Sequence, residues 1–229
     1  MVCFKENEEI SIGGSAKNNM AEYPESTIFD SKRLIGLKFK NPSVQKDIKN
    51  WPFKVIEDEK TKKPKYKQKI KNEEKEYFPE DIASIILDYI KNYAEISIEG
   101  KPIKNAIITV PANFENSQRL MTIEAAKKIG LNIIKVINEP TAAAIAYGDI
   151  IQSNKERNVL IFDLGGGTFD VTILKITGNE YKVLASLGED HLGGEDFNQR
   201  IINYIFSSIK INDKFKRITF SNKNDKKSR

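Results

Sequence analysis

The chain of 229 residues is 39% hydrophobic and 30% charged, which is typical of a folded globular protein. It has no run of eighteen apolar residues and no apolar stretch after Met1, so we predict neither a membrane span nor a secretory signal, and we expect a cytoplasmic protein. Cys3 is the only cysteine, which excludes an internal disulfide and argues against a cysteine-based metal site.

The net charge of +5 belongs to the end of the sequence. Residues 212–229 carry seven Lys/Arg against two Asp, so the rest of the chain balances to zero. We expect this basic tail to be a disordered or frayed end, because it carries no known nucleic-acid-binding module. Nucleic acid is therefore an unfavoured partner.

The first third of the chain gives weak structural signals. Residues 1–28 show little hydrophobic periodicity. Residues 54–76 are dense in charge, and we interpret them as an exposed hairpin or sheet edge rather than a core element. A helix then begins at Pro79, with apolar residues at helical spacing on one face. These residues are Ile82, Ile85, Ile86, Tyr89, Ile90 and Tyr93.

Strands and helices alternate in the middle of the chain. The apolar run at 105–110 predicts a buried strand, and 116–130 predicts a helix that stops at Gly130. A strand at 132–137 and a helix at 139–148 follow. The alanines at 142–144 and 146 would let that helix pack close to a neighbour.

Three strands and a helix end the patterned part. The strands are expected at 158–164, 168–176 and 181–187, with a turn between the last two, and the helix at 195–209. The order indicates a mixed α/β fold with an antiparallel meander in its second half.

The stretch "IFDLGGGTFD" at 161–170 places three glycines between two strands. It matches neither the P-loop nor the dinucleotide fingerprint, but a glycine-tipped hairpin can converge backbone N–H groups on a phosphate. Asp163 at the strand end would suit a magnesium ion or its bound water, and Thr168 offers a hydroxyl. The alternative is a tight hairpin whose glycines supply left-handed turn geometry, with Asp163 capping a neighbouring loop.

The same stretch resembles the second phosphate loop of the 70-kDa heat-shock protein chaperones. Further segments resemble that family in the same order, nearly continuously from about residue 12 to about residue 210. They are "IFDSKRLIGLKF" (28–39), "WPFKVI" (51–56), "NAIITVPANFENSQR" (105–119), "GLNIIKVINEPTAAAIAYG" (130–148) and "HLGGEDFNQR" (191–200). The loop alone would also allow actin-like proteins or sugar kinases, which share the fold that the resemblance implies.

The resemblance implies an ATP-dependent chaperone that binds ATP or ADP with Mg²⁺ and hydrolyses ATP to assist protein folding and the stress response. Lys32, Glu139 and Asp163 match catalytic positions, and the last two match the magnesium shell, Glu139 through water. The residues that match the phosphate and ribose contacts are Gly165, Gly166, Gly167, Thr168, Gly193, Gly194 and Glu195.

Four other residues have weaker or different assignments. Asp170 matches the second aspartate of the loop motif. Arg119 resembles a position that communicates with the interdomain linker and co-chaperones. His191, the only histidine, is expected to pack structurally rather than act as a base. Asn113 departs from the family, in which Tyr usually follows "VPA".

The resemblance implies an actin/hexokinase-like (ribonuclease-H-like) α/β ATPase fold with mixed sheets and flanking helices, here incomplete. We expect a divergent segment at 1–11 and a partial first lobe at 12–151, with an exposed charged subdomain at about 12–78. A partial second lobe at 152–211 and the basic tail at 212–229 follow.

Two family features have no counterpart in this sequence. These are the first phosphate loop, of the form D-L-G-T-T, and the later segments that supply most of the adenine pocket and the peptide-binding domain. We therefore expect impaired nucleotide binding and weak or absent ATPase activity. The alternative is a non-enzymatic interaction protein that competes for co-chaperones; the expected partners are J-domain proteins and nucleotide-exchange factors.

Overall fold

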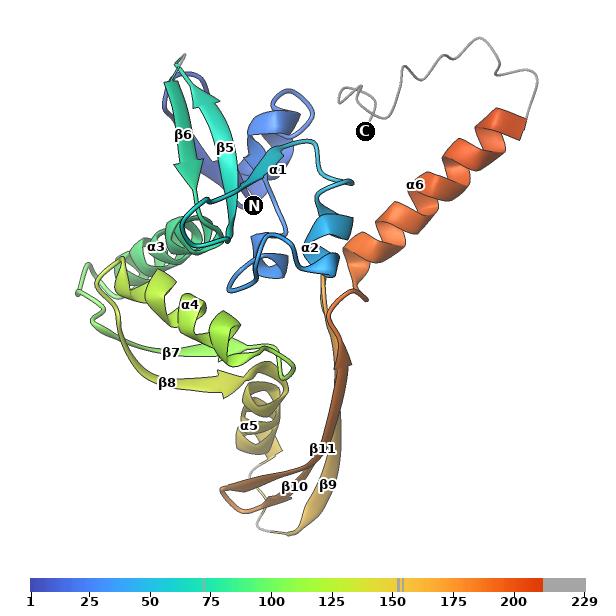
Figure 1. The fold of residues 1–229 in the computed structure, drawn as a ribbon. Coiled ribbons are helices and arrows are strands. Elements are labelled where there is room, and N and C mark those ends of the chain that lie inside the picture. Colours follow the sequence, from blue (N-terminus) through green and yellow to red (C-terminus); the bar gives the residue numbers. More distant parts are fainter. Residues whose placement is uncertain (72, 152, 154, 212–229) are drawn as a thin grey trace. The chain divides into compact units, whose positions relative to one another are not determined.

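The computed structural model describes residues 1–211 except 72, 152 and 154 (Figure 1). The described residues form two compact units. Unit 1 comprises residues 1–106 and 116–134, and unit 2 comprises residues 107–115 and 135–211. The sequence predicted a boundary between lobes at residues 151 and 152. That boundary remains a prediction, because the division into compact units does not test it.

Unit 1 contains most of the short elements. In chain order they are β1 (Val2–Phe4), β2 (Ile10–Ile12), α1 (Gly14–Asn19), the 3-10 helix η1 (Pro24–Ser26), β3 (Thr27–Ile28), the 3-10 helix η2 (Ser31–Arg33), α2 (Pro42–Asp47), β4 (Lys54–Glu57), β5 (Pro64–Ile70), β6 (Glu73–Tyr77), α3 (Pro79–Ser97) and α4 (Asn116–Lys127). No helix among the described residues of either unit is long and apolar enough to cross a bilayer.

Unit 2 contains α5 (Glu139–Ile151), β9 (Arg157–Leu164), β10 (Phe169–Thr177), β11 (Glu180–Glu189) and α6 (Gly194–Ile211). The remaining two strands, β7 (Asn105–Val110) and β8 (Asn132–Asn138), pair with each other, and the division between the units falls within both.

Residues 1–28 are more ordered than their weak pattern predicted. β1 pairs antiparallel with β2 on one side and β3 on the other, so that Val2 lies opposite both Ile12 and Ile28. These strands are two or three residues long, which is too short to display a readable alternation of apolar and polar positions.

The interpretation of residues 54–76 as outside the core was wrong. They form most of the antiparallel sheet β4-β5-β6, and alternate residues of β5 are buried, including Tyr66 and Ile70. The lysines between them point to the opposite face, where Lys65 and Lys67 pair with Glu76 and Glu74 at 3.0 and 2.6 Å. Because successive side chains of a strand point to opposite faces, a strand can bury one face in the core even when its overall composition is highly charged.

Unit 1 has a continuous hydrophobic core. Phe4 stacks on Tyr77 with ring centroids 4.7 Å apart, and Trp51 stacks on Phe53 at 5.2 Å. The buried cluster consists of Val2, Phe4, Ile28, Leu34, Val44, Phe53, Tyr66, Ile70 and Ile82. Its members come from β1, β3, α2, β5 and the start of α3 and from the segments between them, so these elements stabilise one another.

The predicted elements between 79 and 138 are confirmed, with changes in burial. The first half of α3 is buried at Ile82, but Tyr93 near its C-terminal end is exposed. β7 is not the buried strand that we expected, because Ile107 is exposed. Gly130, with a φ of 76°, follows the end of α4 as predicted.

The sheet β11-β10-β9 dominates unit 2 (Figure 1). Both strand pairs are antiparallel, with one irregularity between Ile173 and Leu174. α5 covers one face of this sheet, where Ala144 packs with Leu174 and Ile176. We predicted that the alanines of this helix would allow close packing, and Ala144 packs closely in this way. The helix continues three residues beyond the expected end at Gly148.

Candidate functional site

The glycine stretch forms the tip of the β9–β10 hairpin. Leu164 lies opposite Phe169 and Asp163 opposite Asp170, and the N–H of Gly165 donates to the carbonyl of Thr168 at 3.0 Å. None of the three glycines has a positive φ. The alternative that they supply left-handed turn geometry is therefore wrong.

The second glycine loop comes so close to this tip that it needs a glycine itself. A Cβ on Gly193 would lie 2.6 Å from the backbone of Gly166, so no side chain fits there. Beyond it, the N–H groups of Gly194 and Glu195 donate to the carbonyls of Gly165 and Gly166 at 3.1 and 2.9 Å. The N-terminal end of α6 is thereby bound to the hairpin tip, and the two predicted glycine loops form one structure.

The hairpin tip keeps the features of a phosphate cradle. The N–H groups of Gly166 and Thr168 form no hydrogen bond within the described part of the chain. A Cβ on Gly166 would meet no atom within 4 Å, so the space beside it is open. Free backbone donors beside open space can bind an anion.

Carboxylates surround this tip. Asp163 is half-buried at the end of β9, and Glu139 is the first residue of α5. Asp170 is only 2% exposed, and its Oδ1 has no hydrogen-bond partner in the part of the chain that the structure describes. Burial raises the pKa of Asp170, and the charges of Asp163, Asp190 and Glu139 raise it further, while a hydrogen bond from the Ala112 backbone lowers it.

The structure gives Asp170 more weight than the sequence did. Its Oδ1 and the Nδ2 of Asn113 lie against the point that a Cβ on Gly188 would occupy, too close for any side chain there. Gly188 therefore leaves room for both side chains. The sequence indicated Asp170 only as the second aspartate of the loop motif. It gave no sign of the role of Gly188, because that role depends on strand register.

The carboxylates at this site could bind Mg²⁺ only together with other ligands. Among the described residues, no three Asp, Glu, His or Cys side chains lie close enough to hold a metal ion. Mg²⁺ bound to a nucleotide commonly keeps water and phosphate oxygens and takes only one or two protein carboxylates. Asp163 and Glu139 fit that limited role.

Two of the remaining predicted residues lie in the other unit. Lys32, exposed in η2, and Arg119, half-buried in α4, belong to unit 1. His191 is half-buried in the second glycine loop, and its backbone N–H donates to Glu189 at 3.3 Å. The structure therefore brings together the predicted loop residues, Asp163 and Glu139 within unit 2.

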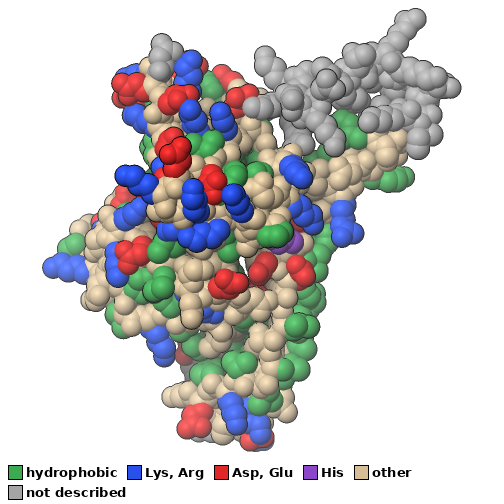
Figure 2. Space-filling model, viewed as in Figure 1, with side chains coloured by type: hydrophobic (Ala, Val, Ile, Leu, Met, Phe, Trp, Pro, Cys, Tyr) green, Lys and Arg blue, Asp and Glu red, His purple; other side chains and the backbone are tan. Residues whose placement is uncertain are grey.

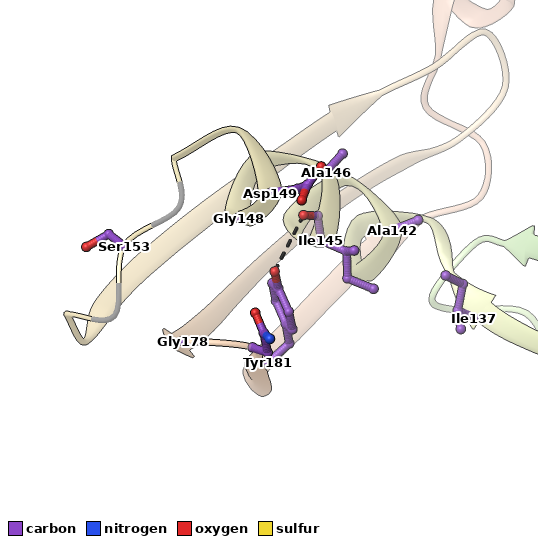
Figure 3. Close-up of a pocket in the computed structure, with 10 residues that line it drawn as sticks. Ile137, Ala142, Ile145, Ala146, Gly148, Asp149, Ser153, Gly178 and Tyr181 are labelled. Atoms are coloured by element: carbon purple, nitrogen blue, oxygen red, sulfur yellow. Dashed lines mark hydrogen bonds between the residues drawn. The ribbon is translucent and has the colours of Figure 1, made fainter.

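A separate pocket of about 720 Å³ lies at the other end of the β10–β11 pair (Figure 3). α5 and the β10–β11 turn line it, and the Tyr181 hydroxyl donates to the Ile145 carbonyl at 3.5 Å. Tyr181 lies so close to Gly148 that a Cβ there would clash with its hydroxyl oxygen. Among the described residues that line the pocket, Asp149 is the only carboxylate, so the pocket lacks the charge cluster of the hairpin tip.

Sequence comparison identifies the family to which these features belong. The sequence model described as "Hsp70 protein" matches residues 1–227. The chain belongs to the Hsp70 family. The match takes in residues 1–11, which we had set apart as divergent, and nearly all of the basic tail, whose expected disorder lies outside the described residues.

Several Hsp70 relatives are similar over most of this chain. Heat shock 70 kDa protein 2 of Paracoccidioides lutzii is 49% identical over 91% of this chain and 31% of its own length. Putative heat shock 70 kDa protein 7 of Homo sapiens is 46% identical over 91% of this chain and 56% of its own length. A ribosome-associated molecular chaperone of Nakaseomyces delphensis is 48% identical over 89% of this chain and 33% of its own length.

The chain thus belongs to a family of chaperones and spans about a third of the length of the first curated relatives that it matches. Its mixed α/β elements, arranged in several small sheets, are consistent with that family.

Proposed function

We propose that this chain is the central part of an Hsp70-type ATPase domain, of actin/hexokinase-like fold, and that its hairpin tip binds the phosphates of ATP or ADP with Mg²⁺. Its lobes would be partial, at 12–151 with the charged subdomain at 12–78, and at 152–211. The observation that carries the proposal is the open space beside Gly166, next to two backbone N–H groups that have no hydrogen-bond partner among the described residues.

The residues of the tip divide into two roles in this proposal. Gly165, Gly166, Gly167 and Thr168 surround the phosphate oxygens. Gly193, Gly194 and Glu195 hold the tip in shape, since the N–H groups of the last two already donate to its carbonyls. A Cβ at Gly193 would disturb the tip even though it touches no ligand.

Charge would complete the site. Mg²⁺, when bound with nucleotide, neutralises phosphate charge, and Asp163 and Glu139 would hold its water shell. We assign Lys32 to positioning the attacking water and the γ-phosphate, because phosphoryl transfer depends mainly on positioning and charge stabilisation. Arg119 would communicate with a co-chaperone or linker.

Binding by the chain alone should be weak. The residues described here offer one glycine hairpin, and each charge-assisted hydrogen bond that a second one would add is worth roughly 1.5–3 kcal/mol. Two such bonds correspond to about a hundredfold or more in affinity. We therefore propose a dissociation constant well above the micromolar range and little or no ATP hydrolysis.

Ligand-observed NMR with Mg·ATP tests the site and suits weak binding. Gly166→Ala adds a methyl group to the open space without displacing protein atoms, so we expect binding to fall at least about tenfold if a phosphate occupies that space. Gly14→Ala in α1 is the matched control, because a Cβ there also meets nothing within 4 Å. Equal binding by wild type and Gly166→Ala would contradict the assignment.

The alternative function is a non-enzymatic interaction protein. It predicts no detectable Mg·ATP binding together with retained affinity for a J-domain protein. Micromolar or tighter nucleotide binding would contradict both the weak-binding proposal and this alternative. A cytoplasmic location remains part of our proposal and is testable by microscopy of the tagged chain.

A further inference from the structure

The charged face of the β4–β6 sheet is not evenly neutralised. Figure 2 shows Lys and Arg side chains interspersed with Asp and Glu over the region where Figure 1 places β5 and β6. Lys65 and Lys67 each have a carboxylate partner. Lys54 and Lys69 are exposed, and neither forms an ion pair with another described residue. Two positive charges on this face therefore lack a counter-charge within the described part of the chain.

Strand register brings these two lysines together. β4 begins at Lys54, which lies directly opposite Lys67 on β5, and Lys69 follows two residues farther along β5. Lys54 and Lys69 are therefore diagonal neighbours across the two strands, with backbones about 7–8 Å apart. Like charges that face one another across a sheet repel, so an anion between these side chains would be stabilising.

The two lysines line one notch where β4 ends beside β5. The register of β4 with β5 stops at Lys67, and the 3-10 helix η1 contacts β5 as well. The side-chain amide of Gln68 donates to the carbonyl of Glu25 at 3.2 Å, which holds η1 against the strand. A pocket of about 190 Å³ opens here, and Lys54, Lys67 and Lys69 all line it.

The carboxylate of Glu74 marks the point at which the lysine charges act together. It lies 2.6 Å from Nζ of Lys67, and this hydrogen bond lowers the pKa of Glu74. The charges of Lys54 and Lys69 lower that pKa further. Glu25 and Glu74 both line the notch, so three lysines against two carboxylates leave a net charge of +1. Because Glu74 already pairs with Lys67, the ammonium groups of Lys54 and Lys69 remain for an external anion.

We propose that this notch binds a phosphate group, either as the free anion or as a phosphate monoester on another molecule. Phosphate offers three strong acceptor oxygens, which can accept from Lys54, from Lys69 and from the hydroxyl of Ser26, which also lines the notch. A carboxylate has one charge and two oxygens, so it satisfies these donors less well.

The notch recognises the phosphate group itself and is separate from the hairpin tip. The described residues that line it include no aromatic ring on which a nucleobase could stack. All of these residues belong to unit 1, whereas the hairpin tip belongs to unit 2.

NMR titration of the ¹⁵N-labelled full chain with inorganic phosphate tests the proposal, with sodium chloride holding the ionic strength constant. Two charge-assisted hydrogen bonds correspond to a dissociation constant of roughly 1 mM. The amides of residues 54 and 67–69 should therefore shift at about that concentration of phosphate. The amides of residues 165–168 report separately on the hairpin tip, so binding at one site is distinguishable from binding at the other.

Three single variants change the charge of the notch in opposite directions. Lys54→Ala and Lys69→Ala each remove one charge-assisted hydrogen bond and should weaken binding at least about tenfold. Glu74→Gln releases Lys67 for the anion and should tighten binding by about the same factor. Lys60→Ala is the matched control, because it removes the same charge at an exposed position outside the notch and should change the affinity little.

A short uncharged peptide with one phosphoserine distinguishes the two sources of phosphate. Shifts at residues 54 and 67–69 with both the peptide and inorganic phosphate would support a monoester site. Shifts with inorganic phosphate alone would support a site for the free anion. The peptide with unmodified serine should cause no shift.

Three results would overturn the proposal. The first is the absence of shifts at residues 54 and 67–69 up to about 20 mM phosphate, well above the expected dissociation constant. The second is the same shifts with sodium chloride alone, which would indicate general screening rather than a site. The third is equal weakening by Lys54→Ala, Lys69→Ala and Lys60→Ala, or weaker binding by Glu74→Gln. Because all four substituted side chains are exposed or half-buried, unchanged circular dichroism should confirm that the variants fold.

Discussion

The two units of this Hsp70-family chain bury very different amounts of apolar surface. Unit 1 encloses a continuous cluster of nine buried side chains from β1 to α3. In unit 2, the cluster of Ala144, Leu174 and Ile176 lies on one face of the β9–β11 sheet, while Phe162 and Leu187 are exposed on the other. Because apolar burial is the main favourable term in folding, we expect unit 1 to be the more stable of the two.

The outer faces of their sheets show what each unit is suited to contact. The outer face of β5 carries lysines paired with glutamates, as in the 2.6 Å pair of Lys67 and Glu74. The outer face of β9 carries Leu160, Phe162 and Leu164. A charged face is stable in water, whereas a contiguous apolar face is typical of a surface that binds protein.

The largest expected effect is at the centre of the unit 1 core. Phe4→Ala removes a buried ring that stacks on Tyr77, and such truncations cost about 3–5 kcal/mol. Trp51 is the only tryptophan and packs in unit 1, so its fluorescence during urea unfolding reports on that unit. Ile96→Ala, at an exposed position of α3, is the control and should change the midpoint little.

A smaller loss is expected in unit 2. Leu174→Ala leaves a cavity between α5 and the sheet, and we expect a cost of about 2 kcal/mol, at the low end for Leu, because few buried neighbours surround it. Hydrogen exchange should accelerate across 157–189. If the units unfold separately, the Trp51 midpoint should not move; an equal shift at Trp51 would show that they unfold together.

Sequence reasoning predicted the long helices and strands after residue 78 better than the shorter elements before it. The positions of α3, α4, α5 and the three strands of unit 2 follow from periodicity and from Pro and Gly signals. The pattern did not reveal β1 to β3, which are too short, or the buried face of β5, which charged residues conceal. It also could not show that Ile107 is exposed, because burial depends on what other elements cover.

The candidate site was predictable in its residues but not in its packing. "DLGGGTFD" indicated a glycine hairpin with an aspartate at each end. The bonding of Gly194 to Gly165, and the space that Gly188 leaves for Asp170, arise from strand register and the path of α6. Residue types indicated the chemistry of the tip, and tertiary structure decided which backbone groups were left open.

Asp170 provides a third, smaller test of the contrast between the units. Its raised pKa means that the folded state holds the proton more tightly than the unfolded state. Its contribution to stability is therefore favourable at low pH and is lost as pH rises from the ordinary aspartate value through the raised pKa. Asp170→Asn should stabilise unit 2 by about 1 kcal/mol at pH 7 and not at pH 3. Hydrogen exchange at the two pH values measures this difference, and a destabilised Asn variant at pH 7 would contradict it.

Asp58 in unit 1 should show the opposite sign and the smallest effect. Hydrogen bonds from Lys65 and Thr61 lower its pKa, so the folded state favours the carboxylate. The stability it contributes is present above the ordinary aspartate value of about 3.9 and is lost as pH falls below it. Asp58→Asn should therefore lower the Trp51 unfolding midpoint at neutral pH and flatten its acid dependence, and the difference from wild type should shrink only as pH falls well below the ordinary aspartate value. Because the ion pair lies at the surface, added salt should weaken the effect, whereas the effect of the buried Asp170 should persist. The carboxylate of Asp58, at the β4–β5 turn, thus stabilises unit 1 as pH rises, whereas the buried carboxylate of Asp170 destabilises unit 2 over the same change.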